Sequence, residues 1–288
     1  MDGPLERSTT SRHLPDAPRE SQGASSAQVL LTAYSFSRAV WKRWPNRTNR
    51  EVLSMSMPSV QVRVSGEFAC FTRPETKVER FSYPVITPSA ARNVLDAICW
   101  RPQMRWIVTR ITVLKPIRFL SVLRNEVQSK LSPAAVQKWM RDPSEFAPLV
   151  AGAGQGTDRT PRNTTLLRDV AYWVDAFPLV FDTSGDNSPA KYAEMMKRRV
   201  QKGQCFTRPY LGCREFAAEF GKPQADDRPI SESLDLGRML YDIAFRPTGN
   251  RATFFEARLE NGVLDTRPDI VLAEESRRRE VLSCSYRH

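Results

Sequence analysis

Apolar and polar residues alternate along several stretches of the chain, and this pattern, with the signals of two helices, predicts an α+β protein. A period of two is typical of strands that bury one face, and short β-branched runs are typical of strands buried on both. The strands that this pattern predicts lie at residues 60–71, 105–115, 117–127, 166–181 and 210–220. Three shorter stretches, at 236–245, 253–259 and 262–264, predict a small antiparallel sheet with Asn261-Gly262 as a hairpin turn.

Two helices are predicted from their start and stop signals. Thr87-Pro88 and Ser188-Pro189 each place a capping hydroxyl before a proline at the first helical position. The first helix ends before Arg101-Pro102, and the second ends at Gly203, which suits the left-handed position after a helix.

The order of these elements is strand, helix, strand pair, helix, strand, which predicts a ferredoxin-like βαββαβ domain over residues 58–220. Residues 131–163 lose the pattern and are expected to form a flexible insertion in this domain. We expect a small C-terminal antiparallel β-sheet domain at 221–266 and a charged tail at 267–288. Residues 1–57 are rich in Ser, Arg, Pro and Asn and are predicted to be a disordered extension. RNA-recognition modules often use such an α+β fold.

Charge narrows the class of partner. The 288 residues carry a formal net charge of +11, and the pI is about 9.7. This balance favours an anionic partner such as RNA, DNA or an acidic membrane face, although it can also serve solubility alone. No run approaches the roughly 20 apolar residues of a membrane span, so we expect a soluble protein with no membrane partner.

Histidine and cysteine usage argue against several kinds of chemistry. The two histidines, His13 and His288, lie in the predicted tails, which weakens the case for zinc catalysis, a Ser-His-Asp triad and a histidine-based ribonuclease. Cys205 and Cys213 lack the short spacing of zinc ligands. We therefore expect no metal and no cofactor, and reduced thiols in a cytoplasmic protein.

The most informative stretch for function runs from Lys191 to Phe216. Between Lys191 and Arg214 it places seven Lys/Arg residues against one carboxylate, Glu194. A helix with a basic face is followed there by a turn rich in Gly, Pro and aromatic residues. This combination suits a phosphodiester backbone with bases stacked beside it, so we expect a nucleic-acid partner.

Three blocks of sequence, taken together, resemble a known family. They are Phe71-Thr-Arg-Pro-Glu-Thr-Lys-Val-Glu-Arg80 with residues 85–92, Pro116-Ile-Arg-Phe119 with Arg124-Asn-Glu126, and residues 202–216. The chain resembles the type I-C (Dvulg subtype) CRISPR-associated proteins of Cas family five, in the RAMP superfamily. The resemblance covers roughly residues 58 to 265, and its most specific blocks are Gly-Gln-Cys-Phe206 and Pro-Tyr-Leu-Gly-Cys-Arg-Glu-Phe216.

The resemblance implies a metal-independent endoribonuclease that cuts precursor CRISPR RNA within each repeat. It also implies that the protein stays on the 5′ handle of the mature crRNA as a subunit of the interference complex (Cascade), with proteins of Cas families seven and eight as partners. The alternative is a catalytically inactive RNA-binding subunit that caps the 5′ end of the crRNA. Binding of double-stranded DNA by the same basic surface would be an addition to either.

The family's active residues are expected at the end of the first helix and at the start of the second. The resemblance assigns Lys191 to charge stabilisation or protonation of the leaving group, and Tyr192 or Cys99 to proton transfer. Cys99 stands where the family has a tyrosine, and Tyr192 stands where it can have a histidine. The alternatives are that Cys99 is a small core residue and that Tyr192 belongs to the apolar stripe of its helix. For Lys191 the alternative is a lysine that only positions a phosphate or is simply solvated.

Ten residues are expected to contact RNA as a cluster, although each alone can be an ordinary surface residue. Tyr210 either stacks on a base or, as we expect, packs in the core. The RNA contacts expected are Arg73, Lys77, Arg80, Arg124, Arg198, Arg199, Lys202, Arg208, Tyr210 and Arg214.

Overall fold

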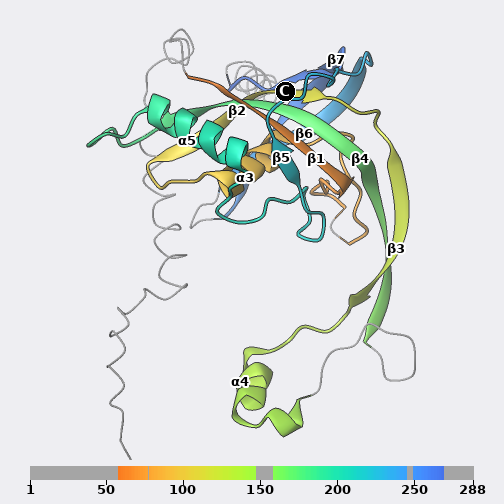
Figure 1. Ribbon diagram of the computed structural model, residues 1–288. Coiled ribbons are helices and arrows are strands. Elements are labelled where there is room, and N and C mark those ends of the chain that lie inside the picture. The colour runs from red at the N-terminus through yellow and green to blue at the C-terminus, as the bar shows by residue number, and fades with distance from the viewer. Residues whose placement is uncertain (1–57, 77, 147–157, 245–248, 269–288) are drawn as a thin grey trace, which may run out of the picture.

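The computed structural model describes residues 58–76, 78–146, 158–244 and 249–268. In this part of the chain an eight-stranded sheet curls along one side of the molecule, and helices α3 (Pro88–Ile98) and α5 (Pro189–Lys202) pack against it (Figure 1). The fold is therefore mixed α and β and built on an antiparallel sheet.

The strands alternate with the helices along the chain. They are β1 (Val60–Ala69), β2 (Met104–Val113), β3 (Phe119–Val127), β4 (Arg159–Val180), β5 (Glu219–Gly221), β6 (Leu234–Ala244), β7 (Arg251–Glu260) and β8 (Val263–Asp265). A short helix, α4 (Pro133–Arg141), and the 3-10 turn η1 (Pro143–Glu145) lie between β3 and β4.

Strand β4 organises the sheet because its 22 residues pair with three other strands. The strand order is β5-β1-β4-β2-β8-β7-β6, and all these pairs are antiparallel. The C-terminal half of β4 pairs with β1 and β2, whereas its N-terminal half pairs with β3. The two parts of β4 meet near Asp169, where the backbone φ is +53°.

The core lies between the sheet and the two helices. Val60, Val62 and Val64 are buried, while the residues between them are at least partly exposed, so the predicted alternation of β1 is confirmed. Trp106 of β2 is completely buried, and its indole N–H donates to the backbone oxygen of Cys99 at 2.7 Å. This bond fixes the end of α3 over the sheet.

The predicted helix boundaries are confirmed by their caps. The hydroxyl of Thr87 accepts from the backbone N–H of Ala90, and that of Ser188 accepts from Lys191. Gly203 has φ +62° and ends α5 in the left-handed conformation. A side-chain acceptor at these positions satisfies a backbone donor that has no partner within the helix.

One of the predicted strands is wrong. Residues 210–220 were predicted as a strand, but Leu211 to Phe216 form a tight loop and only Glu219–Gly221 pair with β1. The described part of the predicted insertion contains α4, η1 and the start of β4, so it is not devoid of regular structure. Its flexibility stays a prediction. Figure 1 shows β3, β4 and α4 as an arm that projects from the body. We refer to residues 119–146 and 158–166 as the arm.

The C-terminal strands continue the main sheet. β8 pairs with β2 as well as with β7, so the sheet runs without interruption from β5 to β6. The predicted hairpin turn at Asn261-Gly262 is confirmed, with both residues at positive φ. The division into domains at residue 221 stays a prediction. The extension at 1–57 lies outside the described residues, as does the tail after Arg267 and Pro268.

Candidate active site and nucleic-acid interface

The first turn of α5 brings two of the three predicted catalytic residues together. The Lys191 ammonium lies 5.8 Å from the centroid of the Tyr192 ring and 2.6 Å from a carboxylate oxygen of Asp186. The Tyr192 hydroxyl donates to the side-chain oxygen of Asn187 at 2.6 Å. We call these four residues the Lys191 cluster.

Exposure distinguishes the members of the Lys191 cluster. The Lys191 side chain is 34% exposed and Asp186 is 86% exposed, whereas Tyr192 is only 2% exposed. The hydrogen bond from Lys191 lowers the pKa of the Asp186 carboxyl. An ion pair so open to water is weak, so an incoming phosphodiester can displace Asp186 from the ammonium.

Cys99 lies at the opposite end of α5 from the Lys191 cluster. It caps the end of α3, is completely buried, and neighbours Arg199 and Arg198, about 12 Å along the axis of α5 from Lys191 at 1.5 Å per residue. Burial raises the pKa of its thiol, although the nearby arginines partly oppose this. The structure therefore does not bring Cys99 to the other two predicted catalytic residues.

The C-terminal half of α5 carries a basic face. Arg198 and Lys202 are exposed, and neither pairs with a carboxylate of the described residues. Arg199 is fixed instead, because its guanidinium donates to the backbone oxygen of Ile98 at 2.5 Å. Arg199 thus joins the ends of α3 and α5, a contact that the helical pattern of the sequence does not reveal.

A second basic group lies where the arm meets the body. Arg124 pairs with Glu215 at 2.8 Å, and Arg80 lies 3.9 Å from Glu126 and donates to the sulfur of Cys213 at 3.2 Å. Glu126 and Glu215 were not among the predicted site residues. Their carboxylates neutralise part of this group, so its net charge is lower than the arginines alone suggest.

The remaining predicted RNA contacts are spread over the body. Arg73 lies over the Tyr83 and Phe81 rings, at 4.9 and 5.6 Å from their centroids. Arg214 is exposed, and exposed Arg208 pairs with Glu219 at 3.3 Å. Lys77 lies outside the described residues.

Tyr210 differs from the expectation. It is 37% exposed and forms an isolated backbone bridge to Ala217, so its predicted place in the core is wrong. The neighbouring Leu211 fills the core instead. The ring of Tyr210 is accordingly accessible for stacking.

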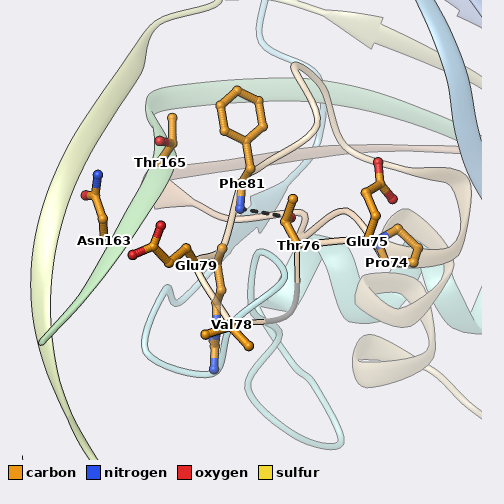
Figure 2. Close-up of a pocket in the computed structure, with 9 residues that line it drawn as sticks. Pro74, Glu75, Thr76, Val78, Glu79, Phe81, Asn163 and Thr165 are labelled. Carbon is orange, nitrogen blue, oxygen red and sulfur yellow. Dashed lines mark hydrogen bonds between the residues drawn. The ribbon is translucent and has the colours of Figure 1, made fainter. Parts of the chain in front are cut away.

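A cavity of about 780 Å³ lies between the loop at residues 74–81 and strand β4. Glu79, Asn163 and Thr165 lie on one side of it, and Thr76 and Glu75 on the other (Figure 2). Phe81 also lines it and is 41% exposed, with its ring 5.9 Å from that of Phe119. An exposed ring beside amide, hydroxyl and carboxylate groups suits an unstacked nucleobase.

The described residues contain neither a candidate metal site nor a membrane-spanning helix. Within them, no group of three or more His, Cys, Asp or Glu side chains is placed to hold a metal ion. None of the helices described is long and apolar enough to cross a bilayer.

Comparison with known proteins gives the family. Residues 59–267 match the model of the CRISPR-associated protein family Cas_Cas5. The chain is 46% identical over 227 residues to the CRISPR pre-crRNA endoribonuclease Cas5d of Mannheimia succiniciproducens, covering 76% of this chain and 98% of that protein. It is 43% identical over 189 residues to the protein of the same name from Thermus thermophilus, covering 66% of this chain and 75% of that protein.

Among solved structures, the chain is similar in fold to SMU1763c of Streptococcus mutans, described as functionally uncharacterized. The TM-score is 0.50 at 21% identity, covering 73% of this chain and 92% of the other. The family match spans both helices and the whole sheet, and it includes the Lys191 cluster and the basic loop at 202–216. The chain therefore belongs to the Cas5d family of CRISPR-associated proteins.

Proposed function

We propose that this chain is a metal-independent endoribonuclease that cuts CRISPR precursor RNA within its repeats. The two relatives at 46% and 43% identity both carry the name CRISPR pre-crRNA endoribonuclease. The observation that carries the proposal is the Lys191 cluster, where an ammonium held only by an exposed carboxylate stands in the first turn of a helix.

The chemistry needs no group beyond RNA and this cluster. The 2′-hydroxyl of RNA attacks the adjacent phosphorus in line, the bond to the 5′-oxygen breaks, and a 2′,3′-cyclic phosphate and a 5′-hydroxyl result. A protein assists by aligning the groups, stabilising the crowded phosphorane, taking one proton and supplying another. We assign Lys191 to the phosphorane charge or to the leaving 5′-oxygen.

The position of Lys191 supports this assignment. The N-terminal turn of a helix favours an anion, and the ammonium adds a full charge there. Proton transfer by Tyr192 requires its hydroxyl to exchange Asn187 for an RNA hydroxyl, because the residue is otherwise buried. Cys99 acts in the same step only after a rearrangement that exposes its thiol.

We infer that the cleaved RNA stays bound by its 5′ handle to the basic groups of α5, the arm and the loop at 202–216. In this role the chain is a subunit of the type I-C interference complex in the cytoplasm, with proteins of Cas families seven and eight as partners. Double-stranded DNA binding by the same basic surface is a further proposal. The exposed cations Arg198, Lys202 and Arg214 support an anionic partner.

We also infer that the body has a ferredoxin-like βαββαβ core. The order β1, α3, β2, β3–β4, α5, β5 along the chain and the neighbours β5-β1-β4-β2 in the sheet support this inference. In this view β6 to β8 form a small C-terminal β domain on the edge of the same sheet.

The structure also offers support for a second candidate function, in which the chain binds RNA without cutting it. A catalytically inactive subunit that caps the 5′ end of the crRNA needs the basic surface but not a reactive Lys191. The ion pair of Lys191 with Asp186 and the burial of Cys99 favour this alternative.

Incubation of the purified full chain with its own repeat RNA in a chelator distinguishes the two functions. We expect a single cut that leaves a 2′,3′-cyclic phosphate, and no cut in RNA with a 2′-deoxy nucleotide at that position. Binding is measured on the same samples by mobility shift. Intact RNA in samples where the RNA is bound would rule out the enzyme and leave the capping subunit.

A further inference from the structure

The loop at residues 211–216 is held against the end of β1 by an unusually close approach of two backbones. The N–H of Cys70 donates to the oxygen of Leu211 at 3.0 Å. Gly212 has φ +85°, and a β-carbon there would lie 2.0 Å from the oxygen of Cys70. Only glycine permits this contact, which brings the next residue, Cys213, onto Cys70.

The two cysteines form a cluster beneath this loop. The Cys213 thiol lies 3.9 Å from the backbone oxygen of Cys70, and the two side chains belong to one small buried cluster. Both are buried free thiols, packed with Leu166 and Phe216. Residues 70 and 213 are far apart in sequence, and nothing in their spacing predicted this pair.

Charged groups around the pair act mainly on Cys213. The Arg80 guanidinium donates to the Cys213 sulfur at 3.2 Å, while Glu126 pairs with Arg80 and Glu215 pairs with Arg124. The hydrogen bond from Cys70, with that from Arg80 and against the effect of burial, lowers the pKa of Cys213 to about 6. The same hydrogen bond raises the pKa of Cys70, which therefore holds its proton.

We propose that Cys213 and Cys70 are a redox-active pair in which Cys213 is the nucleophile and Cys70 the resolving thiol. A cationic partner and a neighbouring second thiol are features of reactive cysteines. This proposal does not depend on the ribonuclease function. It assigns a modification site to the block Gly-Cys-Arg-Glu at 212–215.

The oxidant is a small peroxide, since the burial of both sulfurs keeps out larger ones. The Cys213 thiolate attacks one peroxide oxygen, the O–O bond breaks, and hydroxide leaves and takes a proton to form water. Cys213 is then a sulfenic acid. The Cys70 sulfur attacks the Cys213 sulfur, its proton joins the departing hydroxyl as a second water, and a disulfide forms. Two thiols lose two electrons, and one hydrogen peroxide becomes two waters.

Formation of the Cys70–Cys213 disulfide changes the contacts of Arg80 at the junction between the arm and the body. A disulfide fixes the loop at 211–216 to β1 and removes the thiolate from Arg80. The guanidinium then keeps only the 3.9 Å contact with Glu126. Oxidation therefore changes the charge beside the arm.

The test is peptide mapping by mass spectrometry after treatment of the full chain with hydrogen peroxide. Trypsin does not cut before proline, so it places Cys70 in residues 64–77 and both Cys205 and Cys213 in residues 203–214. Cys205→Ser is therefore used as the background. We expect a cross-link between peptides 64–77 and 203–214 that is absent in Cys213→Ala and that dithiothreitol reduces to the two separate peptides. In the natural sequence, exposed Cys205 is the matched control thiol.

A second readout tests the role of Arg80. The ultraviolet absorbance of the thiolate, which needs no reagent to reach the buried sulfur, is measured against pH on the folded Cys205→Ser protein. We expect a midpoint near pH 6 and a shift to higher pH in Arg80→Gln. A Cys213 that stays reduced at peroxide levels which oxidise Cys205, or that joins any cysteine other than Cys70, would overturn the proposal.

Discussion

At the scale of single residues, exposure separates the groups that can reach RNA from those that hold the protein together. Lys191 stands at the surface with a weakly held partner, whereas Cys99 and Tyr192 are buried. Arg198 and Lys202 are open to solvent, whereas Arg199 is tied to the backbone of α3. Residue type alone does not distinguish Arg198 from its neighbour Arg199.

The burial of Cys99 gives a direct prediction for Cys99→Tyr. A phenol ring does not fit a completely buried position at the end of α3, so we expect a loss of about 1–3 kcal/mol in the free energy of unfolding. Cleavage should not become faster. Denaturant unfolding and single-turnover cleavage of the folded variant check both parts. A faster cut at unchanged stability would show that position 99 faces the RNA.

The contact of Gly212 with Cys70 predicts a large effect of a single methyl group. Gly212→Ala adds backbone strain at φ +85° and a clash with a backbone oxygen, so we expect a loss of more than about 2 kcal/mol. Gly185→Ala is the matched control, because its φ is +63° and nothing lies within 4 Å. Thermal unfolding of both variants compares the two. Equal losses of stability in the two variants would mean that the loop at 211–216 accommodates the added methyl group without a clash.

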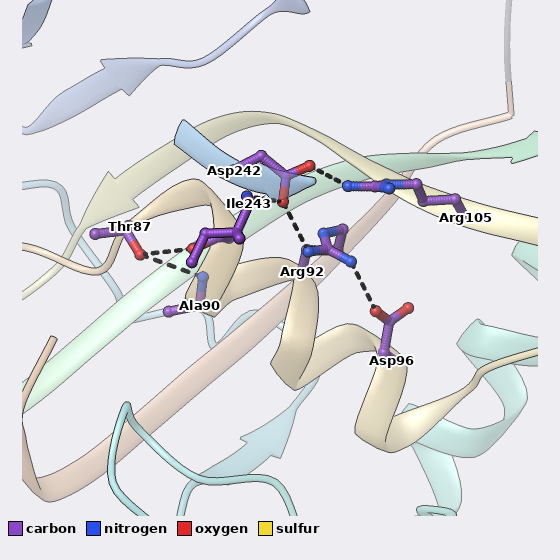
Figure 3. A network of polar contacts seen from close by, with 8 residues as sticks. Thr87, Ala90, Arg92, Asp96, Arg105, Asp242 and Ile243 are labelled. Carbon is purple, nitrogen blue, oxygen red and sulfur yellow. Dashed lines mark hydrogen bonds and ion pairs between the residues drawn. The ribbon is translucent and has the colours of Figure 1, made fainter. Parts of the chain in front are cut away.

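At the scale of elements, a polar network joins α3, β2 and β6. Arg92 pairs with Asp242 at 2.9 Å and with Asp96 at 3.4 Å, and Arg105 pairs with the other oxygen of Asp242 (Figure 3). Burial raises the pKa of Asp96 to about 6, against the effect of Arg92 and Arg105. The network ties the C-terminal strand β6 to the helix that ends at Cys99.

The raised pKa of Asp96 predicts how stability depends on pH. Because the folded state binds this proton more tightly than the unfolded state, stability from Asp96 is present below about pH 4 and is lost as the pH rises through about 6. We therefore expect the melting temperature of the natural chain, relative to Asp96→Asn, to fall between pH 4 and pH 7. The exposed Asp226→Asn serves as control. A rise in this relative melting temperature would mean that the ion pair with Arg92 affects the pKa of Asp96 more than burial does.

Elements differ in how far the sequence predicts them. The caps at Thr87 and Ser188 are local chemistry, so both helices were predicted with their starts. The loop at 211–216 has the alternation of a strand, but Gly212 and the backbone of Cys70 bend it. α4 was missed although Ser132-Pro133 gives the same start signal as Ser188-Pro189, and none of its residues is buried. The Cys70–Cys213 pair depends on tertiary contact and left no local signal.

At the scale of the whole molecule, basic residues lie on α5, on the arm and on the loop that follows α5. Carboxylates neutralise those at the junction of arm and body, namely Arg80 and Arg124. Among the predicted RNA contacts in the described residues, Arg198, Lys202 and Arg214 are exposed and form no ion pair with a carboxylate. The net charge of +11 therefore overstates how many groups are ready to bind phosphate.

This distribution predicts the salt dependence of RNA binding. If three or more cations contact phosphates, the logarithm of the binding constant should fall with log[KCl] with a slope of about −2 or steeper. Replacing Arg198, Lys202 and Arg214 by glutamine should flatten the slope by about 2, at about 0.7 per contact on single strands. Filter binding with a 2′-deoxy repeat RNA gives both slopes, and Lys197→Gln is the control. An unchanged slope would place the RNA elsewhere.

The most direct test of the central claim is single-turnover cleavage of the repeat RNA by the Lys191→Ala variant in a chelator. We expect the rate to fall by about 100-fold or more, while the affinity for RNA falls only a few-fold, since Lys191 acts on charge that develops during the reaction. Lys197→Ala, which removes the same charge two turns further along α5, should cut at the natural rate. Cleavage by Lys191→Ala at the natural rate would contradict the account.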